Sequence, residues 1–271
     1  MQQVSVIVRT RDKARTVGRV LETLRRQTVD VEIVVVDSGS TDGTLDIVRA
    51  RCDQLVEIPA EQFSYGRALN IGARTASGEI LCALSAHCFP ASPDWITRVL
   101  HHYSNPRVAA TNGLWLHPYG LTGGQPFIQT APDQVDRYRG FSNHASSWRR
   151  SVWEQFPFDE SLEACEDKEW ALRVLEAGWA IAFDPALYVQ RVHTLSESPR
   201  QLYARHRREA RVMSRLPGAH RFTADDAFRT WWADFPQPSN KPTWLRRLRW
   251  RRALAIAAKY HGERQTGEGG A

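Results

Sequence analysis

The chain has 271 residues, of which 42% are hydrophobic and 24% charged, and its formal net charge is +6. This composition excludes membrane-spanning and disulfide-rich secreted proteins, because no apolar run approaches bilayer length and the four cysteines show neither a CxxC pair nor regular spacing. The N-terminus also lacks the basic flank and cleavage site of a signal peptide. We expect a cytoplasmic protein with free thiols that could touch a membrane only at its surface.

The first hundred residues alternate between short β-branched runs and segments with helical periodicity. Residues 4–8 and 31–36 are short runs of mainly apolar, β-branched residues, the pattern of strands buried on both faces of a parallel sheet, and apolar residues recur at helical spacing over 17–24. The alternation continues with a helix face at 45–48, a strand over 55–58, a helix over 68–76 and a strand over 80–84. Such β–α repeats predict a doubly wound, Rossmann-like sheet whose ligands bind beyond the carboxyl ends of the strands.

The rest of the chain is less regular. A helix is predicted over 95–103 and a strand over 108–116, whereas residues 117–132 carry several Gly and Pro residues and are predicted to form a loop. From Gln201 onward the sequence is helical and basic, and its tail after Gly262 is typical of disorder. A helical basic extension is therefore expected after the α/β part.

Two motifs carry candidate chemistry. Asp37 follows a buried strand, where its carboxylate could accept hydrogen bonds from a base or a ribose; the alternative is an Asx-type turn, with Asp42 capping the next helix. The segment Glu166–Trp170 crowds carboxylates onto the start of a predicted helix, where a well-capped helix is the simple alternative to a functional site. Neither GxGxxG after the first strand nor GxxxxGK[ST] is present, which disfavours dinucleotide and P-loop enzymes.

Taken in order, Val4–Thr10, Val34–Thr44 and Glu166-Asp167 resemble the family 2 glycosyltransferases, which have the GT-A fold. The segment 63–79 is similar to the one that these enzymes place between the nucleotide and metal sites. The resemblance covers about residues 4–195 and implies an inverting, hexosyltransferase-type enzyme that moves a sugar from a nucleotide-sugar to an acceptor hydroxyl.

The resemblance also implies a domain organisation. A GT-A catalytic domain is expected over residues 1–195, with a nucleotide-binding half over 1–100 and an acceptor-binding half over 101–195. Residues 196–271 would form the helical basic extension.

By the same resemblance, Thr10, Asp12, Asp37 and Arg67 would hold the nucleoside. Asp37 suits the N–H of a pyrimidine and Arg67 can reach a carbonyl or phosphate, so a UDP-sugar is the preferred donor, although thymine and guanine have similar edges. Arg67 could instead be a helix-surface arginine, and Asp12 could cap the first helix.

The expected metal site departs from the family pattern. The family usually carries Asp-x-Asp at the end of the fourth strand, but this chain has Ser85-Ala86-His87. An imidazole still binds divalent ions, and some relatives with an Asp-x-His variant use that histidine together with a second one beyond the acidic motif. The resemblance therefore implies His87 and His193 as the candidate ligand pair for Mn²⁺ or Mg²⁺, completed by diphosphate oxygens and water. The alternative is that His87 hydrogen-bonds phosphate directly without a metal.

The resemblance places the general base at Asp167, which would take the proton of the acceptor hydroxyl. Glu166 could raise the basicity of Asp167 by like-charge repulsion or bind the acceptor directly, and Glu169 could face the same cleft. Asn143 and Trp170 are candidate sugar-binding residues, although an amide often satisfies local backbone and a tryptophan in an apolar context is often core.

The acceptor could be a glycan, a lipid-linked molecule or a small molecule. Basic residues at 205–208 and 246–252 could contact an anionic membrane surface or a polyprenyl phosphate, or simply form a solvated helix; nucleic-acid binding is not expected because no recognised module accompanies the charge. The rival functions are a sugar-nucleotide-binding protein that lost transfer activity and a membrane-surface interaction protein on an α/β scaffold.

Overall fold

The computed structural model describes residues 4–113, 125–132, 140–192, 198–217, 256–258 and 261. The chain divides into two compact units. The first comprises Met1–Ser161 and Glu166–His193, and the second comprises Leu162–Cys165 and Thr194–Ala271. The short segment before Glu166 thus groups with the C-terminal part, which the sequence did not predict.

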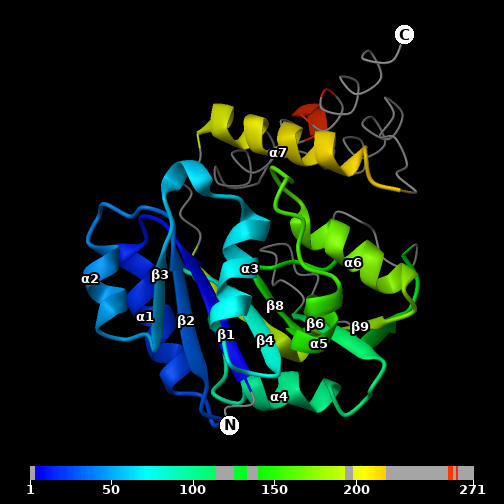
Figure 1. Cartoon of the computed structure of the whole chain (residues 1–271), viewed down its shortest axis with the longest axis horizontal. Helices are drawn as coiled ribbons and strands as arrows, with labels where there is room; N and C mark the ends of the chain where they lie inside the picture. The colour runs from blue at the N-terminus through cyan, green and yellow to red at the C-terminus, as the bar shows by residue number, and fades with distance from the viewer. Residues whose placement is uncertain are drawn as a thin grey trace, which may run out of the picture. The chain divides into compact units, whose positions relative to one another are not determined.

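An eight-stranded mixed sheet forms the centre of the first unit, in the order β3-β2-β1-β4-β8-β6-β9-β7 (Figure 1). Its strands are β1 (Val4–Thr10), β2 (Glu32–Asp37), β3 (Gln54–Glu57), β4 (Ile80–Ser85), β6 (Val108–Gly113), β7 (Phe127–Gln129), β8 (Ala145–Arg149) and β9 (Ala180–Asp184). The first four are parallel, as the β–α repeats predict. β8 runs antiparallel to both of its neighbours, so the complete sheet is mixed.

The helices of this unit are α1 (Ala14–Arg25), α2 (Thr44–Arg49), α3 (Tyr65–Thr75), α4 (Trp95–His102), α5 (Arg150–Gln155) and α6 (Glu166–Glu176). The predicted apolar face over 17–24 is the buried face of α1. Helix α3 begins before the predicted residue 68 because the Ser64 hydroxyl accepts the backbone N–H of Arg67 and caps the helix.

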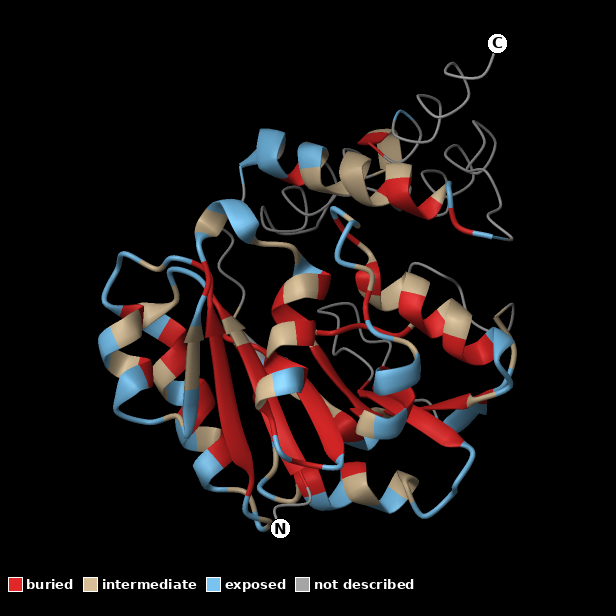
Figure 2. Ribbon diagram, in the orientation of Figure 1, coloured by how far each residue is buried: buried red, intermediate tan, exposed pale blue. Residues whose placement is uncertain are grey.

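The core lies on both faces of the sheet, because side chains alternate along each strand. On β1, Ile7 packs in the cluster that α3 and α6 cover, whereas Val6 and Val8 pack in the cluster that α1 and α4 cover. Figure 2 shows the central strands buried throughout and β3 partly exposed. The helices on the two faces leave the strands' carboxyl ends as the edge at which loops bring polar residues together.

Several short elements escaped prediction. Strand β7 lies inside the segment predicted to be a loop, and β5 (Cys88–Pro90) pairs antiparallel with β10 (Val189–Arg191). Short 3-10 turns occupy Ala60–Gln62 and Pro185–Leu187. Strand β6 is described only to Gly113, where a Cβ atom would lie 2.1 Å from the carbonyl oxygen of Leu187, so a side chain would force the neighbouring turn to move.

All four cysteines are free thiols, as expected, and Cys82 and Cys88 are buried. In the second unit, α7 (Pro199–Met213) begins with a capping box between Ser198 and Gln201. No helix in the described part of the chain is long and apolar enough to cross a membrane.

Candidate active site

The loops after β1 and β2 are tied together by their own side chains. An Asp12 oxygen accepts the backbone N–H of Thr41 at 2.9 Å, and the Asp12 N–H donates to the Ser40 hydroxyl at 2.9 Å. An Asp42 oxygen accepts the N–H of Ala14 at 3.1 Å, at the start of α1. Asp12 therefore does not cap the first helix; the neighbouring loop supplies that contact, and Asp12 joins the two loops.

Asp37 is fully buried at the end of β2. One carboxylate oxygen accepts the N–H groups of Gly39 and Ser40 at 3.0 and 2.8 Å, and the other accepts the Ser40 hydroxyl. This is the Asx-type turn that the sequence left open. The carboxylate shapes the loop, and its contact with a nucleoside stays a prediction.

Thr10, at the end of β1, is 4% exposed. Its hydroxyl oxygen is buried without a hydrogen-bond partner among the described residues. An unpartnered buried hydroxyl lowers stability, so a polar ligand atom would improve this position. The role of Thr10 as a nucleoside contact stays a prediction.

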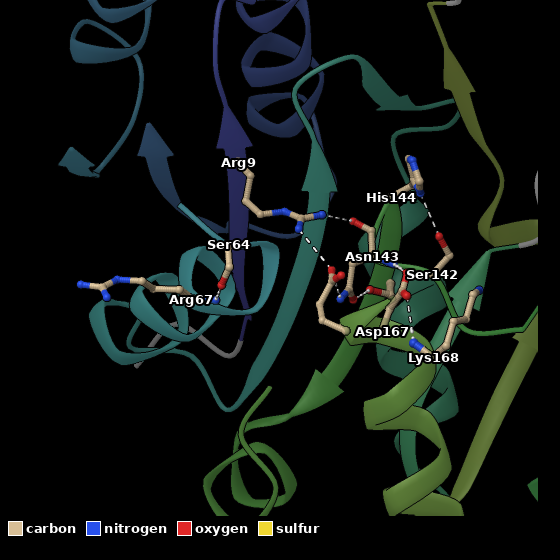
Figure 3. Close-up of polar contacts among 10 residues, drawn as sticks. Arg9, Ser64, Arg67, Ser142, Asn143, His144, Asp167 and Lys168 are labelled. Atoms are coloured by element: carbon tan, nitrogen blue, oxygen red, sulfur yellow. Dashed lines mark hydrogen bonds and ion pairs between the residues drawn. The ribbon is translucent and has the colours of Figure 1, made fainter. Parts of the chain in front are cut away.

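Arg67 lies in the first turn of α3, and its guanidinium donates to the Gln62 side chain at 3.0 Å. Figure 3 shows the Arg67 side chain extending away from Asn143 and Asp167. Arg67 therefore does not join the cluster of residues around the candidate base.

A polar cluster formed by Arg9, Asn143, Glu166 and Asp167 joins the end of β1 to the start of α6 (Figure 3). The Arg9 guanidinium donates to a Glu166 oxygen at 3.4 Å and to the Asn143 carbonyl oxygen at 3.1 Å. The Asn143 N–H donates to an Asp167 oxygen at 3.2 Å, and its side-chain amide donates to Glu166 at 3.4 Å. The sequence predicted the two acids and Asn143 but gave Arg9 no role.

Asp167 is half-buried. Its second oxygen accepts the N–H of Lys168 at 2.8 Å. The Lys168 ammonium donates to the carbonyl oxygens of Gly140 and Phe141, which anchors the segment that precedes Asn143. Backbone N–H groups therefore hold both oxygens of Asp167 in place.

Glu166 is buried, and burial raises the pKa of its carboxyl to about 7. The negative charge of Asp167 raises that pKa further, whereas the positive charge of Arg9 opposes the rise. The site thus holds a proton-exchanging group that ionises close to neutral pH.

Two predicted acceptor residues have other partners. Trp170 is fully buried, donates from its indole N–H to the Phe156 carbonyl oxygen at 2.6 Å and packs against Phe141 and Phe158. Glu169 forms a two-contact ion pair with Arg173 on the next turn of α6. Trp170 is a core residue, so we leave it out of the acceptor site proposed below.

At the end of β4, His87 is joined by a second imidazole, that of His144, with ring centroids 6.1 Å apart. The Ser142 hydroxyl and His144 Nδ1 lie 2.8 Å apart. Within the described ranges no three His, Cys, Asp or Glu side chains gather as a metal site would require. These residues alone do not complete a divalent-metal site, and the predicted partner His193 lies outside them.

Comparison with known proteins places this geometry in a family. A model of glycosyl transferase family 2 matches residues 5–150. An O-antigen chain rhamnosyltransferase of Salmonella typhimurium is 23% identical over 222 residues, which cover 75% of this chain and 70% of the relative. A glycosyltransferase of Haloferax volcanii is 29% identical over 194 residues, which cover 66% of this chain and 64% of the relative.

Solved structures share the fold. A mannosyltransferase of Pyrobaculum calidifontis in complex with GDP-Man and Mn²⁺ has a TM-score of 0.61 at 19% identity, covering 99% of this chain and 76% of that one. Glucosyl-3-phosphoglycerate synthase of Mycobacterium tuberculosis, in complex with Mn²⁺, UDP and glucosyl-3-phosphoglycerate, has a TM-score of 0.60 at 16% identity, covering 80% and 82%. Because the family model spans more than half of the chain, this protein belongs to glycosyl transferase family 2 and is a nucleotide-sugar glycosyltransferase with a GT-A-like fold.

Proposed function

We propose that the enzyme transfers a sugar from a nucleoside diphosphate sugar to an acceptor hydroxyl with inversion of the anomeric configuration, and that Asp167 is the general base. The observation that carries this proposal is the setting of Asp167. Its half-buried carboxylate lies at the start of α6, and backbone N–H groups hold both of its oxygens, one from Asn143 and one from Lys168.

The reaction needs one base and one departing group. The acceptor hydroxyl loses its proton to Asp167 as its oxygen forms a bond to the anomeric carbon of the donor. The bond between that carbon and the diphosphate oxygen breaks, and nucleoside diphosphate leaves with the electron pair. Because attack and departure occur on opposite faces of the sugar, a single displacement inverts the anomeric configuration.

Substitution of Asp167 by Asn tests the proposal, since it removes the base and keeps the size of the side chain. We expect Asp167→Asn to lower kcat by about 10²–10⁴-fold, the usual contribution of a general base. Donor binding, measured by calorimetry, should stay within about threefold of the parent protein. Glu176→Gln is the matched control, because Glu176 is an exposed acid at the other end of the same helix.

The same measurement separates the rival functions. Near-normal turnover of Asp167→Asn would remove that residue from the mechanism. Donor binding without turnover or donor hydrolysis in the parent protein, across several nucleotide-sugars, would instead favour a binding protein that has lost transfer activity.

For the donor we propose a UDP-sugar as the first candidate, bound near Thr10, Asp12, Asp37 and Arg67. The support is the resemblance of these strand-end segments to the family, together with the buried hydroxyl of Thr10. Structural neighbours were solved with UDP and with GDP-Man, so guanosine and thymidine diphosphate sugars belong in the same screen.

For the acceptor we propose a hydroxyl of a glycan, a lipid-linked molecule or a small molecule, with Asn143 and Glu169 near its binding site. We also retain the proposals that His87 and His193 bind Mn²⁺ or Mg²⁺ and that the basic extension contacts an anionic membrane surface. The support for a metal is that two structural neighbours were solved in complex with both Mn²⁺ and a nucleotide, together with the chemistry of an imidazole that follows β4.

A further inference from the structure

Arg9 is the cation of a buried ion pair to which the reaction described above assigns no role. The exposed fractions of the Arg9 and Glu166 side chains are 13% and 6%. The guanidinium also lies over the ring of Tyr65, 5.3 Å from its centroid. Burial of two charges costs solvation energy that the pairing often only balances, so this pair needs a reason other than stability.

The contacts of Arg9 connect it to the candidate base through one residue. The guanidinium binds Glu166 with one nitrogen and the Asn143 carbonyl oxygen with another. The N–H of Asn143 then donates to Asp167 at 3.2 Å, and its side-chain oxygen accepts the Ser146 hydroxyl at 2.8 Å. A change at Arg9 would therefore reach Asp167 through the position of Asn143 and the charge of Glu166.

We propose that Arg9 is a positioning residue for transfer: it supports the negative charge of Glu166 beside Asp167 and holds Asn143 so that its N–H orients the base. The proposal rests on the role of Asp167 proposed above. Arg9 lies at the end of β1 beside Thr10, so it also links the base to the strand end at which the nucleoside is expected.

The charges around Glu166 fix the direction of the pH effect. Asp167 on α6 disfavours the Glu166 charge, Arg9 on β1 favours it, and the Asn143 amide before β8 donates to it. Loss of Arg9 should therefore raise the pKa of Glu166. Transfer should then need a higher pH, because the proposed positioning uses the negative charge of Glu166 beside the base.

The first experiment does not depend on transfer. The Glu166 carboxyl is followed by carbon NMR across a pH titration and assigned from the signal that disappears in Glu166→Gln. We expect the midpoint near pH 7 in the parent protein and a higher midpoint in Arg9→Gln. Arg26→Gln is the matched control, because it removes an arginine from an exposed ion pair with Glu22 and should leave the midpoint unchanged. An unchanged midpoint in Arg9→Gln would overturn the proposal even if Asp167 is the base.

The second experiment measures kcat, KM and donor affinity against pH. Arg9→Gln should lower kcat at neutral pH by about 10- to 100-fold through a misplaced base, with donor affinity within about threefold. The acid limb of its pH profile should move to higher pH. In Arg9→Lys the acid limb of the kcat profile should stay near the pH of the parent protein, because the positive charge remains. The value of kcat should still fall, because a single ammonium cannot reproduce both guanidinium contacts.

The double variant Arg9→Gln/Glu166→Gln checks the charge directly. It removes the charges of both Arg9 and Glu166, so the pH profile of its kcat no longer contains the ionisation of Glu166. The acid limb of that profile should therefore lie at lower pH than in the parent protein. A loss confined to KM or donor affinity would make Arg9 a donor-binding residue and overturn the positioning role. If Asp167→Asn were active while the Glu166 midpoint moved as expected, the assignment of the base would fail and the Arg9–Glu166 coupling would stand.

Discussion

Thr10 provides a test of the nucleotide site at the scale of one hydroxyl group. Its oxygen is buried and lacks a partner among the described residues. Thr10→Val replaces this hydroxyl by a methyl group of similar size. Stability without ligand should therefore be unchanged or rise slightly, while donor affinity should fall by about 1 kcal/mol, the value of one hydrogen bond.

Thr16→Val is the control for this change. The Thr16 hydroxyl is also buried, but it donates to the Ala86 carbonyl oxygen at 2.7 Å. Its removal should lower the melting temperature without ligand, as measured by calorimetry. If Thr10→Val behaved like Thr16→Val and bound donor normally, Thr10 would be a structural residue rather than a nucleoside contact.

For single residues, the sequence predicted the position of a side chain in the fold better than it predicted its hydrogen-bond partners. Asp37 and Asp167 lie at a strand end and a helix start, as their neighbours in sequence indicated. The partners were harder to predict, because the oxygens of Asp37 are held by the loop that follows it, whereas Asp167 is held by Asn143 from a distant segment. When folding brings both a local and a distant polar group within reach of a carboxylate, the sequence cannot show which of them forms the hydrogen bond. Trp170 was open to both interpretations for the same reason.

Helix α6 carries the acidic residues of the site in its first turn. Helix N-termini favour negative charge, yet Glu166 is buried and its pKa is raised from 4.5 to about 7. An acid whose pKa is higher in the folded state makes the fold less stable as pH rises from its unfolded pKa to its folded pKa. Glu166 should therefore destabilise the protein progressively between about pH 4.5 and pH 7, with no further change above that range.

Glu166→Gln tests this effect through denaturant unfolding at pH 5 and pH 8. The free energy of unfolding of the variant minus that of the parent protein should be larger at pH 8 than at pH 5, by on the order of 1–3 kcal/mol, because only the parent is destabilised as Glu166 ionises. Glu176→Gln, at an exposed position on the same helix, should show no such difference. Parallel pH curves for Glu166→Gln and the parent would contradict the raised pKa.

Elements with strong local patterns were predictable from the sequence. The apolar repeat over 17–24 and the β-branched runs of β1 and β2 each carry their own signal. Strands β5, β7 and β10 have three residues each, and their pairing with distant segments defines them. Antiparallel β8 follows a region of weak pattern, so the mixed order of the second half of the sheet could not be read in advance.

The chain combines an α/β unit with a second unit that contains α7. Ion pairs within the second unit join Glu209 to Arg205 and His206, and Glu163 to Arg211. Part of the basic charge of α7 is therefore neutralised internally. The other basic run, at 246–252, lies outside the described residues, so the proposed membrane contact depends mainly on a segment that only the sequence characterises.

Ligand binding to the α/β unit should appear as a shift in its thermal unfolding, because a ligand that binds only the folded state stabilises it. A matching nucleoside diphosphate at about 100 times its Kd adds about 2.7 kcal/mol, which is about 5–10 °C for a domain of this size. We expect UDP to give the largest shift, Mn²⁺ to enlarge it, and His87→Ala to abolish only the enlargement. His101→Ala, at an exposed histidine of α4, is the control. Equal thermal shifts with Mn²⁺ and with a chelator would contradict the proposed metal site and favour direct binding of the diphosphate by His87. The physical reason would be that Ser85-Ala86-His87 lacks the carboxylates that attract a hard cation.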